Sequence, residues 1–234
     1  MTIDKYQSRT QLLEDLDSAF AGYEELDDAV RGFDRFSDQA YQIISSPRSR
    51  NAFDLTLEPD HEVDRFGRHE FGQSMLLTTR LIEAGVRFVT VLLEGWDTHQ
   101  DNFNKLGREL LPNLDQSLSA LFDRLGEQGR LDSTAVLVTG EFGRTPKVNK
   151  NSGRDHWARA MCSLMAGGNV QPGQVIGGTD EKAASPVGDG FSPDDLAASF
   201  FANIGIDPKT EYEANVGRPI TLIRDGSPIP GLLG

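Results

Sequence analysis

The stretch that decides the fold runs from residue 86 to residue 102 and reads VRFVTVLLEGWDTHQDN. Its first eight residues are mostly apolar and rich in β-branched side chains, which is typical of a buried strand. Its polar second half contains Asp97 and His99. Ligands of open α/β sheets gather beyond the carboxyl ends of strands, so the stretch predicts both a sheet and a polar site at its edge.

Helix-like and strand-like segments alternate after this stretch and immediately before it. Helices are predicted over residues 72–84, 104–125 and 193–204, and further buried strands over 134–139 and 160–166. Within the second helix, Pro112 marks either a kink or a restart. This order indicates an α/β fold with a mixed or mostly parallel sheet flanked by helices.

The N-terminal quarter has a different character. Residues 1–64 hold 15 acidic and 6 basic side chains, and apolar residues recur at helical spacing between Leu12 and Phe36. We therefore predict an acidic helical arm over 1–64 and an α/β metal-site domain over 65–234. The arm either covers or presents a site, or it is a solvated amphipathic hairpin packed on the domain.

Composition excludes several classes of protein. The 234 residues contain 36 acidic and 23 basic side chains, a net charge of −13, which argues against a nucleic-acid partner. A single cysteine, Cys162, excludes an internal disulfide and a thiolate zinc cluster. No apolar run approaches the ~18 residues of a membrane span, and the first residues show no export signal.

Carboxylates and histidines gather in the loops beside the predicted strands. The candidate metal ligands are Asp97, His99, Glu141, Asp155 and His156. Carboxylate oxygen and imidazole nitrogen together suit zinc, manganese or iron, and carboxylate-rich sites suit magnesium or calcium.

Several of these residues also have a structural interpretation. Asp97 and His99 fit a polar turn as well as a metal site, and Glu141 fits an ion pair with Arg144. Arg144 and Arg154 are candidate catalytic residues, because guanidinium groups match tetrahedral oxyanions. Alternatively, both arginines neutralise the neighbouring carboxylates.

Longer motifs carry a family resemblance. The segments GWDTHQDNF, LVTGEFGRTPKVN, NSGRDHW and AGGNVQPGQVIGGTD, in this order, resemble the domain-of-unknown-function family numbered 1501. The resemblance groups the chain with the alkaline phosphatase and sulfatase superfamily. It implies an alkaline-phosphatase-like fold and a site with zinc, magnesium, manganese or calcium for hydrolysis of a small-molecule or polysaccharide phosphate or sulfate ester.

The resemblance also implies roles for individual residues. Asp97 and His99 match an Asp/His metal pair, Glu141 an acidic ligand, and His156 a later histidine ligand with Asp155 beside it. Asp155 and His156 alternatively match an adjacent Asp-His pair. The superfamily's nucleophile would come from a GGPSH-D-type segment upstream of this chain, preceded by an export signal to the periplasm or cell exterior.

Two functional hypotheses follow from these observations. The first is a metal-dependent hydrolase domain, the C-terminal portion of a longer enzyme, which needs the missing N-terminal portion or another chain. The second is a non-catalytic binding or scaffold domain that keeps the site geometry.

Overall fold

The computed structural model describes residues 46–188, 190–213 and 217–234. The chain divides into two compact units. The described residues of the first are 46–60 and 80–90, and those of the second are 61–79, 91–188, 190–213 and 217–234. The apolar stripe predicted between Leu12 and Phe36 lies outside the described residues. The helical arm over 1–64 and its boundary therefore stay predictions.

In the smaller unit, the short helix α3 (Pro47–Phe53) is bonded to Arg80, in the last turn of the longer helix α5 (Glu70–Glu83). Helix α3 begins with proline in its first turn, where the missing N–H costs nothing, and a 3₁₀ turn, η1 (Leu55–Leu57), follows. Arg80 donates from Nε to the carbonyl of Ala52 at 3.1 Å and forms an ion pair with Glu58. Both charged side chains are mostly buried, so each satisfies the other.

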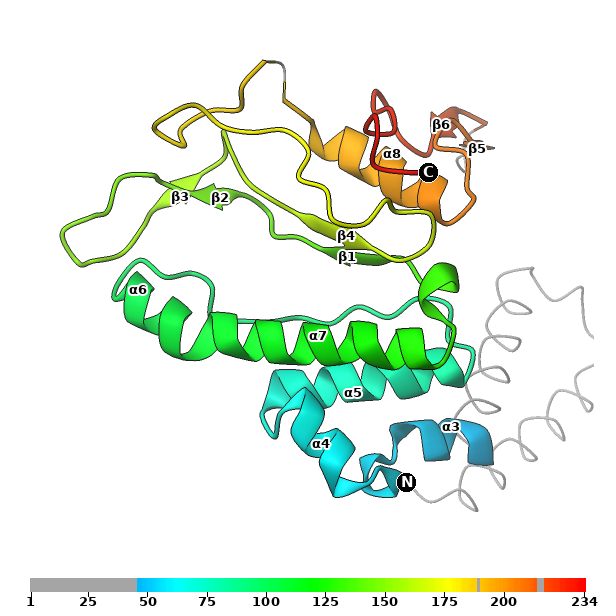
Figure 1. The fold of residues 1–234 in the computed structure, drawn as a ribbon. Helices are drawn as coiled ribbons and strands as arrows, with labels where there is room; N and C mark the ends of the chain where they lie inside the picture. The colour runs from blue at the N-terminus through cyan, green and yellow to red at the C-terminus, as the bar shows by residue number, and fades with distance from the viewer. Residues whose placement is uncertain (1–45, 189, 214–216) are drawn as a thin grey trace, which may run out of the picture. The chain divides into compact units, whose positions relative to one another are not determined.

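The predicted helices over 72–84, 104–125 and 193–204 are confirmed, with shifted ends (Figure 1). The observed helices are α4 (Asp60–Phe66), α5 (Glu70–Glu83), α6 (Asn102–Lys105), the π-helical turn η2 (Leu106–Leu110), α7 (Leu111–Glu127) and α8 (Pro193–Asn203). Between α6 and α7 the chain stays helical, but it widens at η2 immediately before Pro112. Proline lacks the N–H of a regular helix and its ring crowds the carbonyl four residues earlier, so a wide turn here accommodates it.

The core of the larger unit is formed largely by the apolar stripe of α7. Leu118, Leu121 and Leu125 on this helix are buried, as is Phe66 at the end of α4. Ser117 Oγ donates to the carbonyl of Phe66 at 2.9 Å, which satisfies a buried polar group where the two helices meet. Full burial of each such side chain stabilises the fold by about 1.5–3 kcal/mol.

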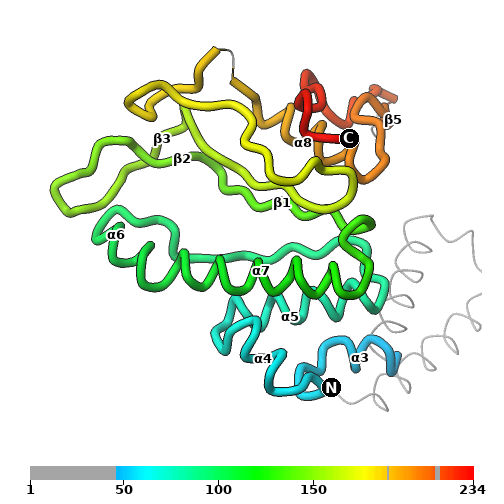
Figure 2. The backbone as a smooth tube through the Cα atoms, viewed as in Figure 1, coloured from blue at the N-terminus to red at the C-terminus, as the bar shows by residue number. Residues whose placement is uncertain are grey.

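All strand pairs among the described residues are antiparallel and two-stranded. They are β1 (Val136–Val138) with β4 (Leu164–Ala166), β2 (Gly143–Arg144) with β3 (His156–Trp157), and β5 (Glu211–Glu213) with β6 (Pro219–Thr221). Figure 2 shows the chain leave β1, pass through β2, turn, and return through β3 beside it to β4. The first two pairs are thus the near and far ends of one long hairpin.

The predicted parallel sheet is not seen in the described residues. The prediction of a strand over residues 86–93 is wrong. This segment is extended, but among the described residues the backbone groups of residues 87–95 have no backbone hydrogen-bond partner. Phe88 is 71% exposed and Leu92 80% exposed. An apolar β-branched run describes local conformation, whereas a strand also requires a neighbour, which the pattern cannot supply.

Helix α8 begins as its sequence predicts. Ser192 accepts from the backbone N–H of Asp195 at 3.1 Å, and the Asp195 carboxylate accepts from the N–H of Ser192 at 2.8 Å. This reciprocal arrangement is a capping box, with Pro193 in the first turn. None of the helices that the structure describes combines the length and the apolar character that a bilayer crossing needs.

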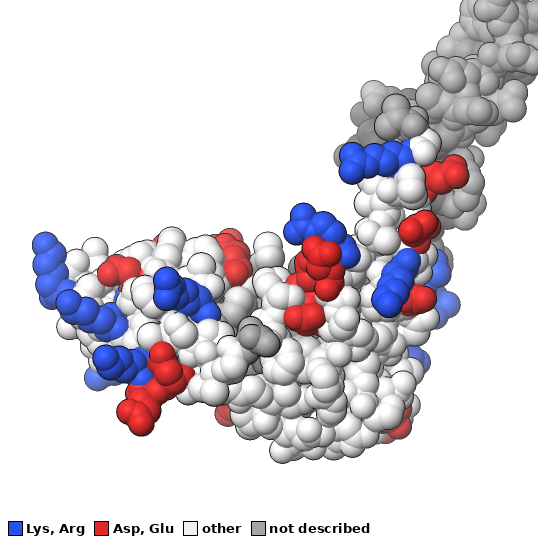
Figure 3. Space-filling model, turned by 90° about the horizontal axis from the view of Figure 1, so that it is seen from above, with Lys and Arg blue, Asp and Glu red and all other residues white. Residues whose placement is uncertain are grey.

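Charges of both signs lie on the surface of the described residues. Figure 3 shows Lys and Arg side chains in several places on the face that it draws, with acidic side chains beside them. Much of this face carries neither sign, so on it the described part shows no broad surface of a single charge.

Candidate metal centre

Two loops far apart in the sequence are joined by their backbones. Residues 98–102, which follow the extended segment, lie against residues 151–154 in the turn of the β2–β3 hairpin. Three bonds form this seam: Arg154 N–H to the Thr98 carbonyl at 3.2 Å, Asp101 N–H to the Asn151 carbonyl at 3.1 Å, and Asn102 N–H to the Ser152 carbonyl at 3.0 Å. The seam brings the predicted ligands of both loops together.

Gly153 allows the backbones to come this close. A Cβ atom built on Gly153 would lie 1.9 Å from the carbonyl oxygen of His99, well inside van der Waals contact. Any other residue at this position would separate the loops. This glycine is therefore required by close approach of the two backbones.

The loop that contains Asp97 and His99 is tightly turned. Thr98 N–H bonds the Trp96 carbonyl at 2.9 Å, and His99 N–H bonds the Asp97 carbonyl at 3.1 Å. The Thr98 hydroxyl is buried and donates to Oδ1 of Asn102 at 2.5 Å. These bonds direct the Thr98 side chain inward and leave Asp97 and His99 beside the hairpin.

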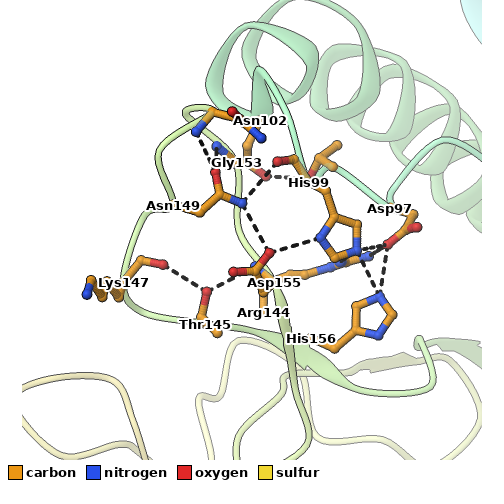
Figure 4. A network of polar contacts seen from close by, with 12 residues as sticks. Asp97, His99, Asn102, Arg144, Thr145, Lys147, Asn149, Gly153, Asp155 and His156 are labelled. Carbon is orange, nitrogen blue, oxygen red and sulfur yellow. Dashed lines mark hydrogen bonds and ion pairs between the residues drawn. The ribbon is translucent and has the colours of Figure 1, made fainter.

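Asp97, His99 and His156 form a compact group of potential metal ligands (Figure 4). Oδ1 of Asp97 lies 3.0 Å from Nε2 of His99 and 3.1 Å from Nε2 of His156. The two Nε2 atoms lie 3.1 Å apart. Three potential ligand atoms, two from the loop after the extended segment and one from β3, thus point toward one another, and all three side chains are partly exposed.

This donor set fits a divalent metal ion. Zinc ligands at 2.0–2.1 Å in tetrahedral geometry stand about 3.3 Å apart, close to the separations of these three atoms. Two imidazole nitrogens and one carboxylate oxygen leave a fourth position for water or substrate, as in catalytic zinc sites. A metal ion would require only a small widening of the group.

Arg144 lies beside the same oxygen. Arg144 and His156 are directly opposite each other on β2 and β3, so their side chains lie on one face of the hairpin. Nη2 of Arg144 donates to Oδ1 of Asp97 at 2.5 Å and to the Trp96 carbonyl at 3.2 Å. The hydrogen bonds from Arg144 and then from His156 lower the pKa of Asp97 to about 2.

Asp155 occupies a different position from the one expected of a ligand. Its Oδ1 lies 3.0 Å from Nδ1 of His99, on the opposite side of the ring from Asp97, and 3.1 Å from Nδ2 of Asn149. Hydrogen bonds from His99 and then Asn149 lower the pKa of the Asp155 carboxyl. Asp155 therefore contacts one of the candidate ligands, His99, and is not one of the group of three.

The other two predicted site residues lie outside this group. Glu141 is exposed, and the ion pair of Arg144 is with Asp97 rather than with Glu141. Arg154 donates from Nη1 to the carbonyls of Thr145 and Pro146 at 2.6 and 2.7 Å. Its guanidinium also lies 5.7 Å from the ring centre of Phe103, so the structure engages Arg154 in holding the hairpin.

Sequence reasoning missed Asn149, which joins the two loops through its side chain. Its Nδ2 donates to the His99 carbonyl at 3.0 Å, and its Oδ1 accepts from the N–H groups of Asn151 and Gly153 at 2.9 and 3.0 Å. The sequence NKNSG at residues 149–153 has the composition of a turn. That signal predicts a loop but cannot predict which loop it contacts.

No curated protein and no solved structure matches the chain. The family model described as "Protein of unknown function (DUF1501)" matches residues 1–233. The chain therefore belongs to the DUF1501 family.

Proposed function

We propose that this protein is a metal-dependent hydrolase domain of the alkaline phosphatase and sulfatase superfamily, acting on a phosphate or sulfate ester. The observation that carries the proposal is the convergence of Asp97 Oδ1, His99 Nε2 and His156 Nε2 within hydrogen-bonding distance of one another. These three residues would hold the metal. The sequence resemblance supplies the reaction class, and with it the assignment of this chain to the C-terminal portion of the fold.

The side chains around the candidate metal position would have two roles, metal binding and substrate binding. Asp97, His99 and His156 would hold a divalent metal, which would supply Lewis-acid polarisation of the ester and activation of water. Arg144 places a permanent positive charge beside the ligand atoms, with Nη1 at 3.4 Å from His99 Nε2. A guanidinium at this position would attract and orient an anionic ester, because its planar donors match tetrahedral oxyanions.

A second candidate, a metal-binding domain without turnover, is favoured by a separate observation. Two hydroxyls near the group, those of Thr98 and Thr145, are already engaged in structural bonds. Thr98 Oγ1 is buried against Asn102, and Thr145 Oγ1 donates to the Lys147 carbonyl while accepting from the Asp155 N–H. The proposal therefore assigns the nucleophile to neither Thr98 nor Thr145.

A turnover screen separates these two functions. The purified protein is incubated with zinc, magnesium, manganese or calcium and with p-nitrophenyl phosphate or p-nitrophenyl sulfate, and release of p-nitrophenol is followed. Metal-stimulated release that disappears in Asp97→Asn, but persists in the exposed helix variant Asp115→Asn, supports the hydrolase. Metal binding with no release from either ester supports the second candidate.

A further inference from the structure

Asp155 lies on the far side of His99 from the candidate metal position, and this arrangement determines what His99 presents there. Both ring nitrogens of His99 lie 3.0 Å from a carboxylate oxygen, but the contact of Nε2 with Asp97 is an ion-pair contact, whereas that of Nδ1 with Asp155 Oδ1 has hydrogen-bond geometry. An ionised carboxylate only accepts hydrogen bonds, so this geometry favours a proton on Nδ1. In a neutral imidazole the other nitrogen, Nε2, then carries the lone pair. Nε2 is the atom that faces Asp97 and His156.

Asn149 holds Asp155 and His99 in a fixed relation. Its amide group uses all its main hydrogen-bonding positions, because Nδ2 donates to Asp155 Oδ1 and to the His99 carbonyl while Oδ1 accepts two backbone N–H groups. The same side chain therefore contacts the backbone of His99 and the carboxylate that bonds its ring. Rotation of the ring away from the metal position would break this connected set.

The backbone of Asp155 is fixed independently of its side chain. Its N–H donates to Oγ1 of Thr145 at 3.0 Å, and its carbonyl accepts from the Thr145 N–H at 2.8 Å. The Asp155 side chain therefore extends from a fixed backbone position, between the residues of the seam and His156. Figure 4 shows Thr145, Asp155, Asn149 and His99 as a continuous chain of contacts that ends at the metal position.

We propose that Asp155, held by Asn149, is a positioning residue that fixes the tautomer and the ring orientation of His99 for metal binding. This inference rests on the proposed metal function of Asp97, His99 and His156. It assigns to Asp155 a role distinct from that of a ligand. Carboxylates that accept the second N–H of a metal-binding histidine commonly change metal affinity by about 10- to 100-fold.

Zinc affinity measured by calorimetry tests the role of Asp155. We expect Asp155→Ala to weaken zinc binding about 10- to 100-fold, and Asp155→Asn to weaken it less, since an amide oxygen still accepts from Nδ1. Asn149→Ala is expected to weaken it in the same direction. Asp115→Asn removes one exposed carboxylate from α7 and is expected to leave zinc affinity unchanged. Wild-type zinc affinity in a folded Asp155→Ala protein would overturn the inference.

The tautomer of His99 gives a second test that does not depend on metal. Long-range proton–nitrogen NMR spectra of the metal-free protein, assigned with His99→Gln, are expected to show the proton on Nδ1. A proton on Nε2 in the wild-type protein would overturn the inference even if Asp155→Ala does not fold. Absence of zinc binding by the wild-type protein would instead overturn the proposed function, and the tautomer would still report whether Asp155 orients His99.

Discussion

Arg144 donates from Nη2 to Oδ1 of Asp97 at 2.5 Å, and this oxygen is the one that lies closest to both histidine Nε2 atoms. A permanent cation and a prospective metal ion therefore share one carboxylate oxygen. The same guanidinium that would attract an anionic substrate opposes binding of a metal cation. Arg144 would therefore favour binding of an anionic substrate and disfavour binding of the metal.

Substitution of Arg144 is expected to shift that balance toward the metal. Arg144→Gln should bind zinc about two- to fivefold more tightly, the size expected for removal of one partly exposed charge interaction. The same variant should bind inorganic phosphate more weakly in the presence of zinc, because it lacks the guanidinium. Titration calorimetry at low ionic strength measures both affinities.

A matched control for this prediction is Arg159→Gln, since Arg159 is exposed and its guanidinium lies 5.9 Å from the ring centre of Trp157. Arg159→Gln removes the same charge away from the site. It should therefore change the affinities for zinc and for phosphate only slightly. Weaker zinc binding in Arg144→Gln would mean that Arg144 organises Asp97 rather than competing for it.

Replacement of Gly153 by alanine should open the seam. The added Cβ would lie 1.9 Å from the His99 carbonyl, so the loop of residues 98–102 must move away from the hairpin. We expect both a lower melting temperature and weaker zinc binding. Overpacking of this kind costs about 1–3 kcal/mol.

The matched glycine control is Gly126→Ala in α7. A Cβ at Gly126 meets nothing within 4 Å, and alanine favours a helix over glycine by about 0.8–1.0 kcal/mol. Gly126→Ala should therefore stabilise the fold and leave zinc affinity unchanged. Equal melting temperatures for the two alanine variants would show that close approach at Gly153 is not required.

The capping box of α8 predicts a pH dependence of stability. Hydrogen bonds from the Ser227 N–H, the Ser192 hydroxyl and the Ser192 N–H lower the pKa of Asp195. A pKa that is lower in the folded than in the unfolded chain stabilises the fold above the unfolded value of about 3.9 and loses that contribution as pH falls below it.

Asp195→Asn should remove this contribution. Its free energy of unfolding should vary less than that of wild type between pH 6 and pH 3, as measured by urea unfolding at each pH. Ser192→Ala, which removes the cap itself, should cost about 0.5–2 kcal/mol at pH 7. An unchanged pH profile in Asp195→Asn would contradict the role assigned to these bonds.

Local features of the fold were predictable from sequence, whereas the pairing of distant segments was not. The apolar stripe of α7 and the Ser192 cap of α8 are short-range signals, and both helices form where they indicate. The segment over 86–93 has the composition of a strand, but strand formation depends on a neighbour elsewhere. The long hairpin of β1–β2 and β3–β4 arises from antiparallel register that composition does not encode.

In the candidate site, too, residue types were predictable from sequence, whereas contacts between distant segments were not. Asp97, His99 and His156 were predictable because residue type and position beside strand-like segments indicate ligands, and the structure brings these three together. The location of Asp155 was not predictable, because it depends on which ring nitrogen of His99 faces the group. Asn149 gave no chemical signal, since its role comes from the meeting of two loops.

The central claim is that Asp97, His99 and His156 bind a divalent metal ion, and titration of the purified, metal-stripped protein with zinc tests it most directly. The account predicts saturable binding of a single ion per chain by calorimetry. Binding should be lost in Asp97→Asn and in the double variant His99→Ala with His156→Ala, and it should be retained in Asp115→Asn. Absence of zinc binding by the wild-type protein, or equal affinity in the double histidine variant, would contradict the account.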